Sequence, residues 1–240
     1  MEALEAARMV VERRFPECST AFLAGSLVRG EATATSDLDI VVITRREEAP
    51  FRESLMEADW PAEVFVHTPE SLRQFMATNA QRRIPTLMMM CAEGIILRDR
   101  EGLAEDIKRE ARRWLAQGPE PLTAAQMDHA RYRVTDLLDD FLGSERFEES
   151  LFIANDLAAH AADLILAQRR QWSGQGKWLL RALRRFDPQR ADQLTAALQR
   201  FYQAGDKTDL TRFAEAALAP VGGRLFAGFR ASGKPGDAQR

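Results

Sequence analysis

Asp37 and Asp39 flank Leu38 in an otherwise apolar stretch, and the spacing of these two carboxylates could support metal chemistry. Residues i and i+2 of a strand point to the same face, so both carboxylates are expected on one side of a sheet. Two carboxylates held this close disfavour each other's ionisation unless a cation lies between them. A Gly-Ser pair, Gly25 and Ser26, precedes Asp37 with ten residues in between. Together these features predict a magnesium site that faces a phosphate group.

Three predicted strands position these residues. An apolar strand over 20–24 ends at Gly25, and the loop that follows it is small and polar. The next strand, 38–44, is almost continuously apolar, as expected of a buried central strand. A third strand over 62–67 carries Glu63, which is a third carboxylate. We therefore expect a small mixed sheet with the three acids on adjacent strands.

The rest of the N-terminal half alternates helices with one more strand. Thr68 is a suitable N-cap for a helix that begins at Pro69. Gly94 separates an apolar helix from a short strand. The expected helices cover 2–15, part of 45–58, 69–77, 84–93 and 101–117, and the additional strand covers 95–98.

The clearest break in composition is the Gly-Pro-Glu-Pro segment at 118–121, which is typical of a domain boundary. No strand pattern follows it, and the apolar periodicity predicts a helical bundle. The fold class is therefore α+β, an α/β-type domain with a small mixed sheet, followed by an all-α bundle. We expect domains at 1–117 and 123–230, a linker at 118–122 and a disordered tail at 231–240. Thr123 is the expected N-cap of the first helix in this half. The expected helices of the second half cover 124–142, 147–171, 177–186, 188–204, 209–218 and a short piece at 224–229.

The bulk properties exclude several classes of protein. The 240 residues carry a net charge of −3, so there is no overall basic field of the kind that drives nucleic-acid binding. Cys18 and Cys91 fit neither a disulfide framework nor a zinc pattern. No apolar run approaches the roughly 20 residues of a membrane span, and the N-terminus does not resemble a signal peptide. We expect a cytoplasmic protein that binds neither a membrane nor nucleic acid.

Nucleotidyl transfer requires the parts that the opening motif offers. An acceptor oxygen attacks the α-phosphate of a nucleoside triphosphate, and two divalent metals roughly 4 Å apart can stabilise the attacking and leaving oxygens. Magnesium takes hard oxygen ligands, which three carboxylates supply. A Gly-Ser turn offers backbone donors and a close approach to the triphosphate.

The order of these parts, with the segment GSLVRGEATATSDLDIVV, resembles the DNA polymerase beta-like nucleotidyltransferase superfamily. The resemblance covers about 22–98 and is strongest to small bacterial members of the kanamycin or minimal nucleotidyltransferase type. It implies a nucleoside triphosphate as co-substrate and two Mg²⁺ ions. The second half loosely resembles the helical bundles that accompany these domains, including HEPN bundles, but it lacks the Arg–His pair of HEPN ribonucleases.

The resemblance also implies roles for individual residues. Asp37 and Asp39 would ligate both metals, and Glu63 would hold the catalytic metal or help to deprotonate the acceptor. Ser26 would contact the β- or γ-phosphate, with Gly25 allowing the approach, and Arg29 could meet the triphosphate. If these residues do not bind a metal, Asp37 would cap a helix or turn, Asp39 would form a salt bridge at the end of the strand, and Glu63 would face the solvent.

Two further places could contribute to a site. His67 follows Glu63 by four residues on the same strand face, although a strand-end histidine is more often structural. Lys177 opens a helix directly after glycines, where it could contact a phosphate, while Trp178 is expected in the core. The alternative for this segment is a simple turn between helices.

The acidic residues of the second half are most simply interpreted as solvent-exposed residues on a helix face. The alternative is that they bind a cationic acceptor or that one of them is the general base for its hydroxyl. The base is left open among Asp139, Asp140, Glu148 and Glu149, and Asp136 shares the same face.

The sequence thus predicts transfer of a nucleoside monophosphate to a hydroxyl of a small molecule, an aminoglycoside-like acceptor being one possibility. One alternative is a protein AMPylase of the antitoxin type, and another is a non-catalytic nucleotide-binding module. No residue pattern determines the acceptor or the preferred nucleobase of the triphosphate. The oligomeric state is also undetermined, and a homodimer is one possibility.

Overall fold

The computed structural model describes residues 1–45 and 48–231 of the chain. The chain divides into two compact units, unit 1 at Met1–Gly118 and unit 2 at Pro119–Arg240. Each unit has its own buried apolar core, as expected of independent domains.

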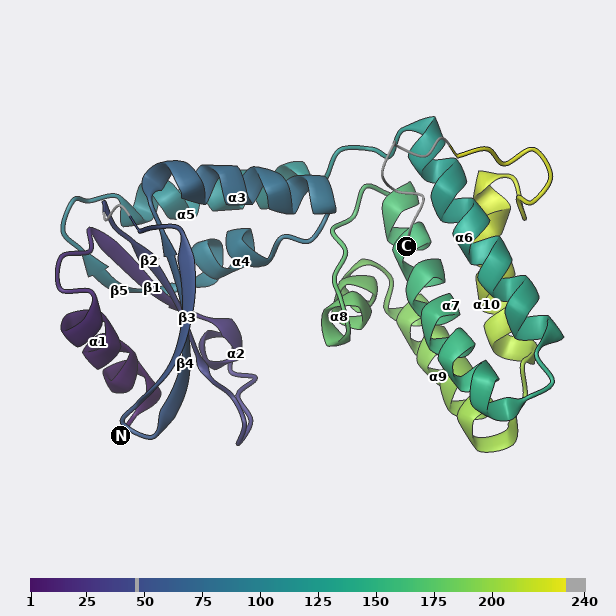
Figure 1. Ribbon diagram of the computed structural model, residues 1–240, viewed down its shortest axis with the longest axis horizontal. Helices are drawn as coiled ribbons and strands as arrows, with labels where there is room; N and C mark the ends of the chain where they lie inside the picture. The colour runs from purple at the N-terminus through teal and green to yellow at the C-terminus, as the bar shows by residue number, and fades with distance from the viewer. Residues whose placement is uncertain (46–47, 232–240) are drawn as a thin grey trace. The chain divides into compact units, whose positions relative to one another are not determined.

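Unit 1 is built on a mixed sheet that has five strands within the described residues (Figure 1). The strand order is β3-β4-β2-β1-β5, with β2 and β4 parallel and every other neighbouring pair antiparallel. The buried central strand β2 has the expected apolar character. The strands are β1 (Thr20–Ala24), β2 (Leu38–Ile43), β3 (Phe51–Glu57), β4 (Trp60–His67) and β5 (Ile95–Asp99).

Helices cover both faces of this sheet. Ala21 and Leu23 of β1 pack with α1, whereas Phe22 points to the other face, 6.0 Å from the Lys108 ammonium of α5. This alternation follows from the two-residue period of a strand. Thr68 caps α3 together with Ser71, as the sequence predicted for Thr68. The helices are α1 (Ala3–Arg14), α2 (Gly25–Val28), α3 (Pro69–Arg82), α4 (Thr86–Glu93) and α5 (Ala104–Gln117).

The predicted helix within 45–58 is wrong for the described part of that segment. Residues Phe51–Glu57 form the edge strand β3, and a turn with positive φ at Ala58 and Asp59 joins it to β4. The strand's alternation is hidden in the sequence because Glu57 and Glu53 point toward α1 and form ion pairs with its arginines. Residues 46 and 47 lie outside the described part.

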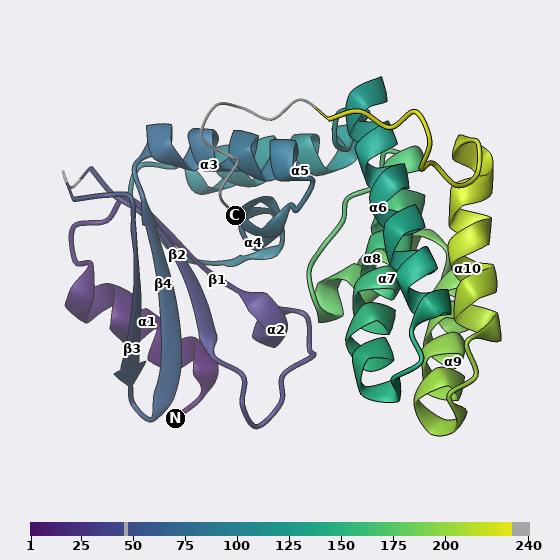
Figure 2. The same cartoon turned by 45° about the vertical axis from the view of Figure 1, so that its right-hand side comes forward.

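Unit 2 is an all-helical bundle. Its central helix, α7, contacts the four other α-helices, and Figures 1 and 2 show α6, α9 and α10 around it. Thr123 and Gln126 form a capping box at the start of α6, so Thr123 is the cap that the sequence predicted. The elements are α6 (Ala124–Gly143), α7 (Phe147–Gln168), α8 (Lys177–Phe186), α9 (Pro188–Ala204), α10 (Thr208–Leu218) and a 3-10 turn, η1 (Ala219–Val221).

The short helix predicted at 224–229 is also wrong. The segment follows η1 without a helix of its own and is held against α6. The Arg131 guanidinium donates to the carbonyl oxygens of Gly222, Gly223 and Arg224, which replaces the internal hydrogen bonds of a helix. The predicted disordered tail lies, from residue 232 on, outside the described residues.

The α7 helix is the one candidate membrane span among the described residues. Its 22 residues contain a window with a mean hydropathy of 1.3, but 56% of that window is buried inside the structure. Its apolar face forms the core of unit 2 with Leu138, Phe141 and Phe201. Packing within the bundle accounts for the apolar composition of this helix.

Candidate active site

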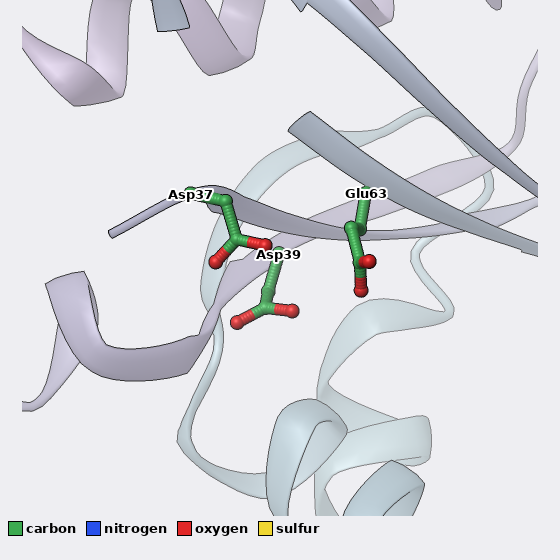
Figure 3. A group of neighbouring side chains, drawn as sticks. All are labelled: Asp37, Asp39 and Glu63. Atoms are coloured by element: carbon green, nitrogen blue, oxygen red, sulfur yellow. The ribbon is translucent and has the colours of Figure 1, made fainter. Parts of the chain in front are cut away.

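The three carboxylates predicted at the site come together in unit 1. Asp39 of β2 lies directly opposite Glu63 of the parallel strand β4, and Asp37 immediately precedes β2. One carboxylate oxygen from each residue lies within 4.8 Å of the other two. Figure 3 shows the three side chains directed to the same side of the two strands. Strand register therefore creates a compact acidic cluster, called here the carboxylate triad.

Gly25 is required by the position of the Asp39 side chain. A Cβ atom on Gly25 would lie 2.0 Å from Asp39 Oδ2, and the backbone φ of Gly25 is +80°. Ala24 pairs with Asp39 across β1 and β2, which brings the turn and the carboxylate together. Only glycine combines this left-handed conformation with the missing side chain. The sequence predicted that Gly25 allows the approach of a phosphate, and the structure adds that Gly25 makes room for Asp39.

The environment of Asp39 opposes its ionisation. Burial, followed by the neighbouring charges of Asp37 and Glu63, raises the pKa of Asp39 from 3.8 to about 6. Arg29 and Arg52 act in the opposite direction and lower this pKa. A divalent cation would relieve the repulsion among the carboxylates, which is the electrostatic condition for a metal site.

Ser26 follows Gly25 at the start of α2 and is tied to the residue before Asp37. Its hydroxyl donates to Ser36 Oγ over 3.1 Å, and the backbone N–H of Thr33 donates to the same oxygen over 2.8 Å. The sequence argument did not single out Ser36, since a serine in a polar loop has no distinguishing pattern. These bonds link the Gly-Ser turn to the strand that carries the aspartates.

Arg29 lies one residue beyond α2 and forms ion pairs with two acidic side chains. It donates to Glu31 Oε2 over 3.3 Å and to Glu93 Oε2 over 3.2 Å, and 18% of its side chain is exposed. The charge of Arg29 also acts on the triad, because it lowers the pKa of Asp39.

Sequence reasoning missed Arg52. It lies on β3, the strand that was predicted as a helix, and its guanidinium forms an ion pair with Glu63. The same guanidinium lies 5.1 Å from the centre of the Phe65 ring. The alternation of Arg52 and Ser54 with Phe51 and Leu55 was the available signal.

His67 has a structural environment. Its side chain is buried at the far end of β4 from Glu63, beside Ser71 and Phe75. Burial lowers the pKa of His67 to about 4, so the ring is neutral at physiological pH. The structural alternative that the sequence favoured for His67 agrees with this burial.

Lys177 lies in unit 2, whereas the triad lies in unit 1. Its exposed side chain opens α8 directly after Gly176, whose φ is +52°. Trp178 is half-buried, with the Arg181 guanidinium 4.7 Å from its ring centre. A phosphate contact for Lys177 stays a prediction.

The acids of unit 2 are dispersed over helix surfaces. Asp139 pairs with Arg224, and Glu149 pairs with Arg146 over 3.1 Å. Asp140 and Glu148 are exposed, and within the described residues neither forms an ion pair. This arrangement agrees with the solvated helix face that the sequence favoured.

The donor set of the triad fits a divalent cation such as Mg²⁺. Three carboxylates supply hard oxygen ligands, and their partial exposure leaves room for the water ligands that Mg²⁺ retains. A cluster of carboxylates on paired strands beside a glycine turn is the type of site that metal-dependent phosphoryl- and nucleotidyl-transfer enzymes use.

The family comparison agrees with this class. Residues 4–84 match the family model described as a nucleotidyltransferase domain. Residues 4–84 of unit 1 therefore form a nucleotidyltransferase domain, and the predicted superfamily is confirmed for this segment. The match contains the Gly-Ser turn and all three carboxylates.

The other comparisons add little. A search of the curated proteins gives no match to this chain. One similar solved structure is a nucleotidyltransferase-like protein from Exiguobacterium sibiricum 255-15, with 15% sequence identity and a TM-score of 0.46. The alignment covers 92% of this chain and 74% of the other.

Proposed function

We propose that the protein transfers a nucleoside monophosphate from a nucleoside triphosphate to a hydroxyl group of an acceptor and releases pyrophosphate. The convergence of Asp37, Asp39 and Glu63 beside the Gly25-Ser26 turn carries this proposal. A small molecule, with an aminoglycoside-like compound as one candidate, is the proposed acceptor.

In this proposal Asp37 and Asp39 would be ligands of two Mg²⁺ ions, and Glu63 would help to hold the catalytic one. The bound ions would supply charge stabilisation for the attacking and leaving oxygens. The protein residues keep the three carboxylates in a fixed geometry on paired strands, so that little reorganisation is needed during the reaction.

Ser26 and Arg29 are the proposed contacts of the triphosphate. The Ser26 hydroxyl, now bonded to Ser36, is a donor at the turn. The Arg29 guanidinium is held by Glu31 and Glu93, and its charge acts on Asp39. An arginine matches the geometry of phosphate oxygens. Lys177 of unit 2 is a further proposed phosphate contact.

A proton must leave the acceptor hydroxyl as the new bond to phosphorus forms. Glu63 is the proposed group that assists this step, since it belongs to the triad. A general base must come within hydrogen-bond reach of the proton that it removes. Asp139, Asp140, Glu148 and Glu149 of unit 2 remain the alternatives.

Pyrophosphate release, measured with each of the four nucleoside triphosphates in Mg²⁺ and with panels of aminoglycosides and lincosamides, tests the proposal. We expect release that depends on the acceptor and on the metal and that is lost in Asp39→Asn. Triphosphate binding without release would contradict transferase activity. A labelled protein band with radiolabelled ATP would instead identify a protein acceptor.

A further inference from the structure

Arg52 is in direct contact with the carboxylate triad. Its guanidinium forms an ion pair with Glu63 Oε1, and its charge also reaches Asp39, whose pKa it lowers. β3 runs antiparallel to β4, with Ser54 opposite Glu63 and Arg52 opposite Phe65. Arg52 thus approaches the triad from a third strand.

We propose that Arg52 is a positioning residue of this site, which orients the Glu63 carboxylate and weakens the affinity of the triad for divalent cations. This inference rests on the proposed function, because it assumes that the triad is the metal site. It adds a residue outside the carboxylates to the determinants of metal binding.

The orienting role follows from the contacts of the guanidinium. The terminal torsion of a glutamate is soft, so the Glu63 carboxylate needs a partner to fix its rotation. Arg52 occupies Oε1 and leaves Oε2 free of this bond. The Phe65 ring, 5.1 Å from the guanidinium carbon, holds the arginine in place. A lysine would keep the charge but would lose the planar geometry.

The effect of Arg52 on the affinity of the triad for divalent cations follows from its positive charge. A positive charge in contact with a metal ligand repels a bound divalent cation, and the repulsion is largest where water is partly excluded. The same charge compensates the repulsion among the carboxylates before a metal binds. Both effects favour the metal-free state, so removal of Arg52 should tighten cation binding.

The chain provides a matched control in the ion pair of Arg14 and Glu53. Its side chains are 51% and 32% exposed, against 58% and 28% for Arg52 and Glu63. Glu53 neighbours Arg52 on β3 but points to the opposite face of the sheet, toward α1. Exposed ion pairs of either kind contribute little to stability, so Arg14→Gln and Arg52→Gln should both fold.

The test is a titration of the full chain with Mn²⁺ alone, followed by electron paramagnetic resonance at pH 8. We expect Arg52→Gln to lower the dissociation constant for Mn²⁺ by about tenfold. We expect Arg52→Lys to stay within about threefold of wild type and Arg14→Gln to be unchanged. With Mg²⁺ and triphosphate, Arg52→Lys should lose kcat by more than Arg14→Gln does, because orientation is lost while charge is kept.

The outcomes separate this inference from the proposed function. If wild type binds Mn²⁺ and Arg52→Gln binds it equally or more weakly, the inference is overturned while the metal site stands. If Asp39→Asn binds Mn²⁺ as wild type does, the triad is not the metal site and both are overturned. Thermal unfolding of each variant confirms that the compared proteins are folded.

Discussion

In unit 1, Asp39 and Glu63 come from neighbouring strands in register and lie within one cluster with Asp37. In unit 2, Asp139 and Glu149 lie on helix surfaces, and each has its own arginine partner. Both units are rich in acids, but only in unit 1 do the described acids converge closely enough to share a cation.

The difference shows that convergence, rather than the number of acids, defines this site. A sheet places side chains of adjacent strands within about 5 Å of each other, which forces like charges together. Acids on a helix surface can instead turn toward solvent or toward a basic neighbour at helical spacing, and such pairs contribute little to stability. The raised pKa of Asp39 is the electrostatic consequence in unit 1.

The largest expected effect comes from neutralising the triad. Asp37→Asn and Asp39→Asn should each reduce kcat by about 10³-fold or more, since metal-based charge stabilisation supplies several kcal/mol. Pyrophosphate release measures this loss, and circular dichroism checks that the fold is intact. Near wild-type turnover in either variant would contradict the metal assignment.

Gly25→Ala should produce the next largest effect. The added Cβ would overlap Asp39 Oδ2, and displacement of a catalytic group by about 1 Å can cost about 100-fold in rate. Gly30→Ala is the matched control, because Gly30 has a similar φ of +70° but nothing within 4 Å of an added Cβ. Both variants should lose about 1–3 kcal/mol of stability through backbone strain.

Both variants should lose stability through backbone strain, but only Gly25→Ala should also lose activity. Steady-state kinetics and urea unfolding of the two variants separate the effects. Equal losses of activity would show that the close approach of Gly25 to Asp39 does not matter for function.

The burial of Asp39 should also affect how the free energy of unfolding depends on pH. Between about pH 4 and pH 6 the folded protein retains a proton on Asp39 that the unfolded chain releases, because the folded pKa is about 6 and the ordinary value is 3.8. The metal-free protein therefore loses stability through Asp39 as the pH rises through this window. Asp39→Asn should be more stable than wild type at pH 8 by about 1–2 kcal/mol, after allowance for partial exposure.

Urea unfolding in EDTA at pH 4, 5, 6 and 8 measures this difference. The comparison must be made between variant and wild type, because His67 contributes the opposite slope over a similar range. Its folded pKa of about 4 lies below the ordinary 6.5, so its contribution to stability falls as the pH falls through that range. A variant less stable than wild type at pH 8 would contradict the repulsion within the triad.

The smallest effects are expected for the exposed acids of unit 2. Asp140→Asn and Glu148→Gln should change kcat by less than about twofold and stability by less than about 0.5 kcal/mol. A fall in kcat of about 100-fold in one of them would identify the general base and would break the contrast between the two units.

Much of the fold was predictable from the chain because local signals were strong. The cap at Thr123, the proline and glycine boundaries and the long apolar periodicities lead to most helices that the structure contains. The β3 strand was missed because Glu53 and Glu57 interrupt its apolar pattern, and their partners Arg14 and Arg13 lie far away in sequence. A helix was wrongly predicted at 224–229, because the Arg131 guanidinium of α6 donates to the Arg224 carbonyl and the Leu225 N–H donates to Thr135 of the same helix.

The sequence by itself determined the kind of chemistry at this site. A Gly-Ser pair directly after one strand and an Asp-Leu-Asp at the start of the next strand lie at a fixed spacing, which is a pattern that the sequence alone displays. The tertiary structure decided what surrounds them. The pairing of Asp39 with Glu63, the room that Gly25 leaves for Asp39, and the Arg52 contact all depend on strand register and side-chain packing between segments distant in sequence.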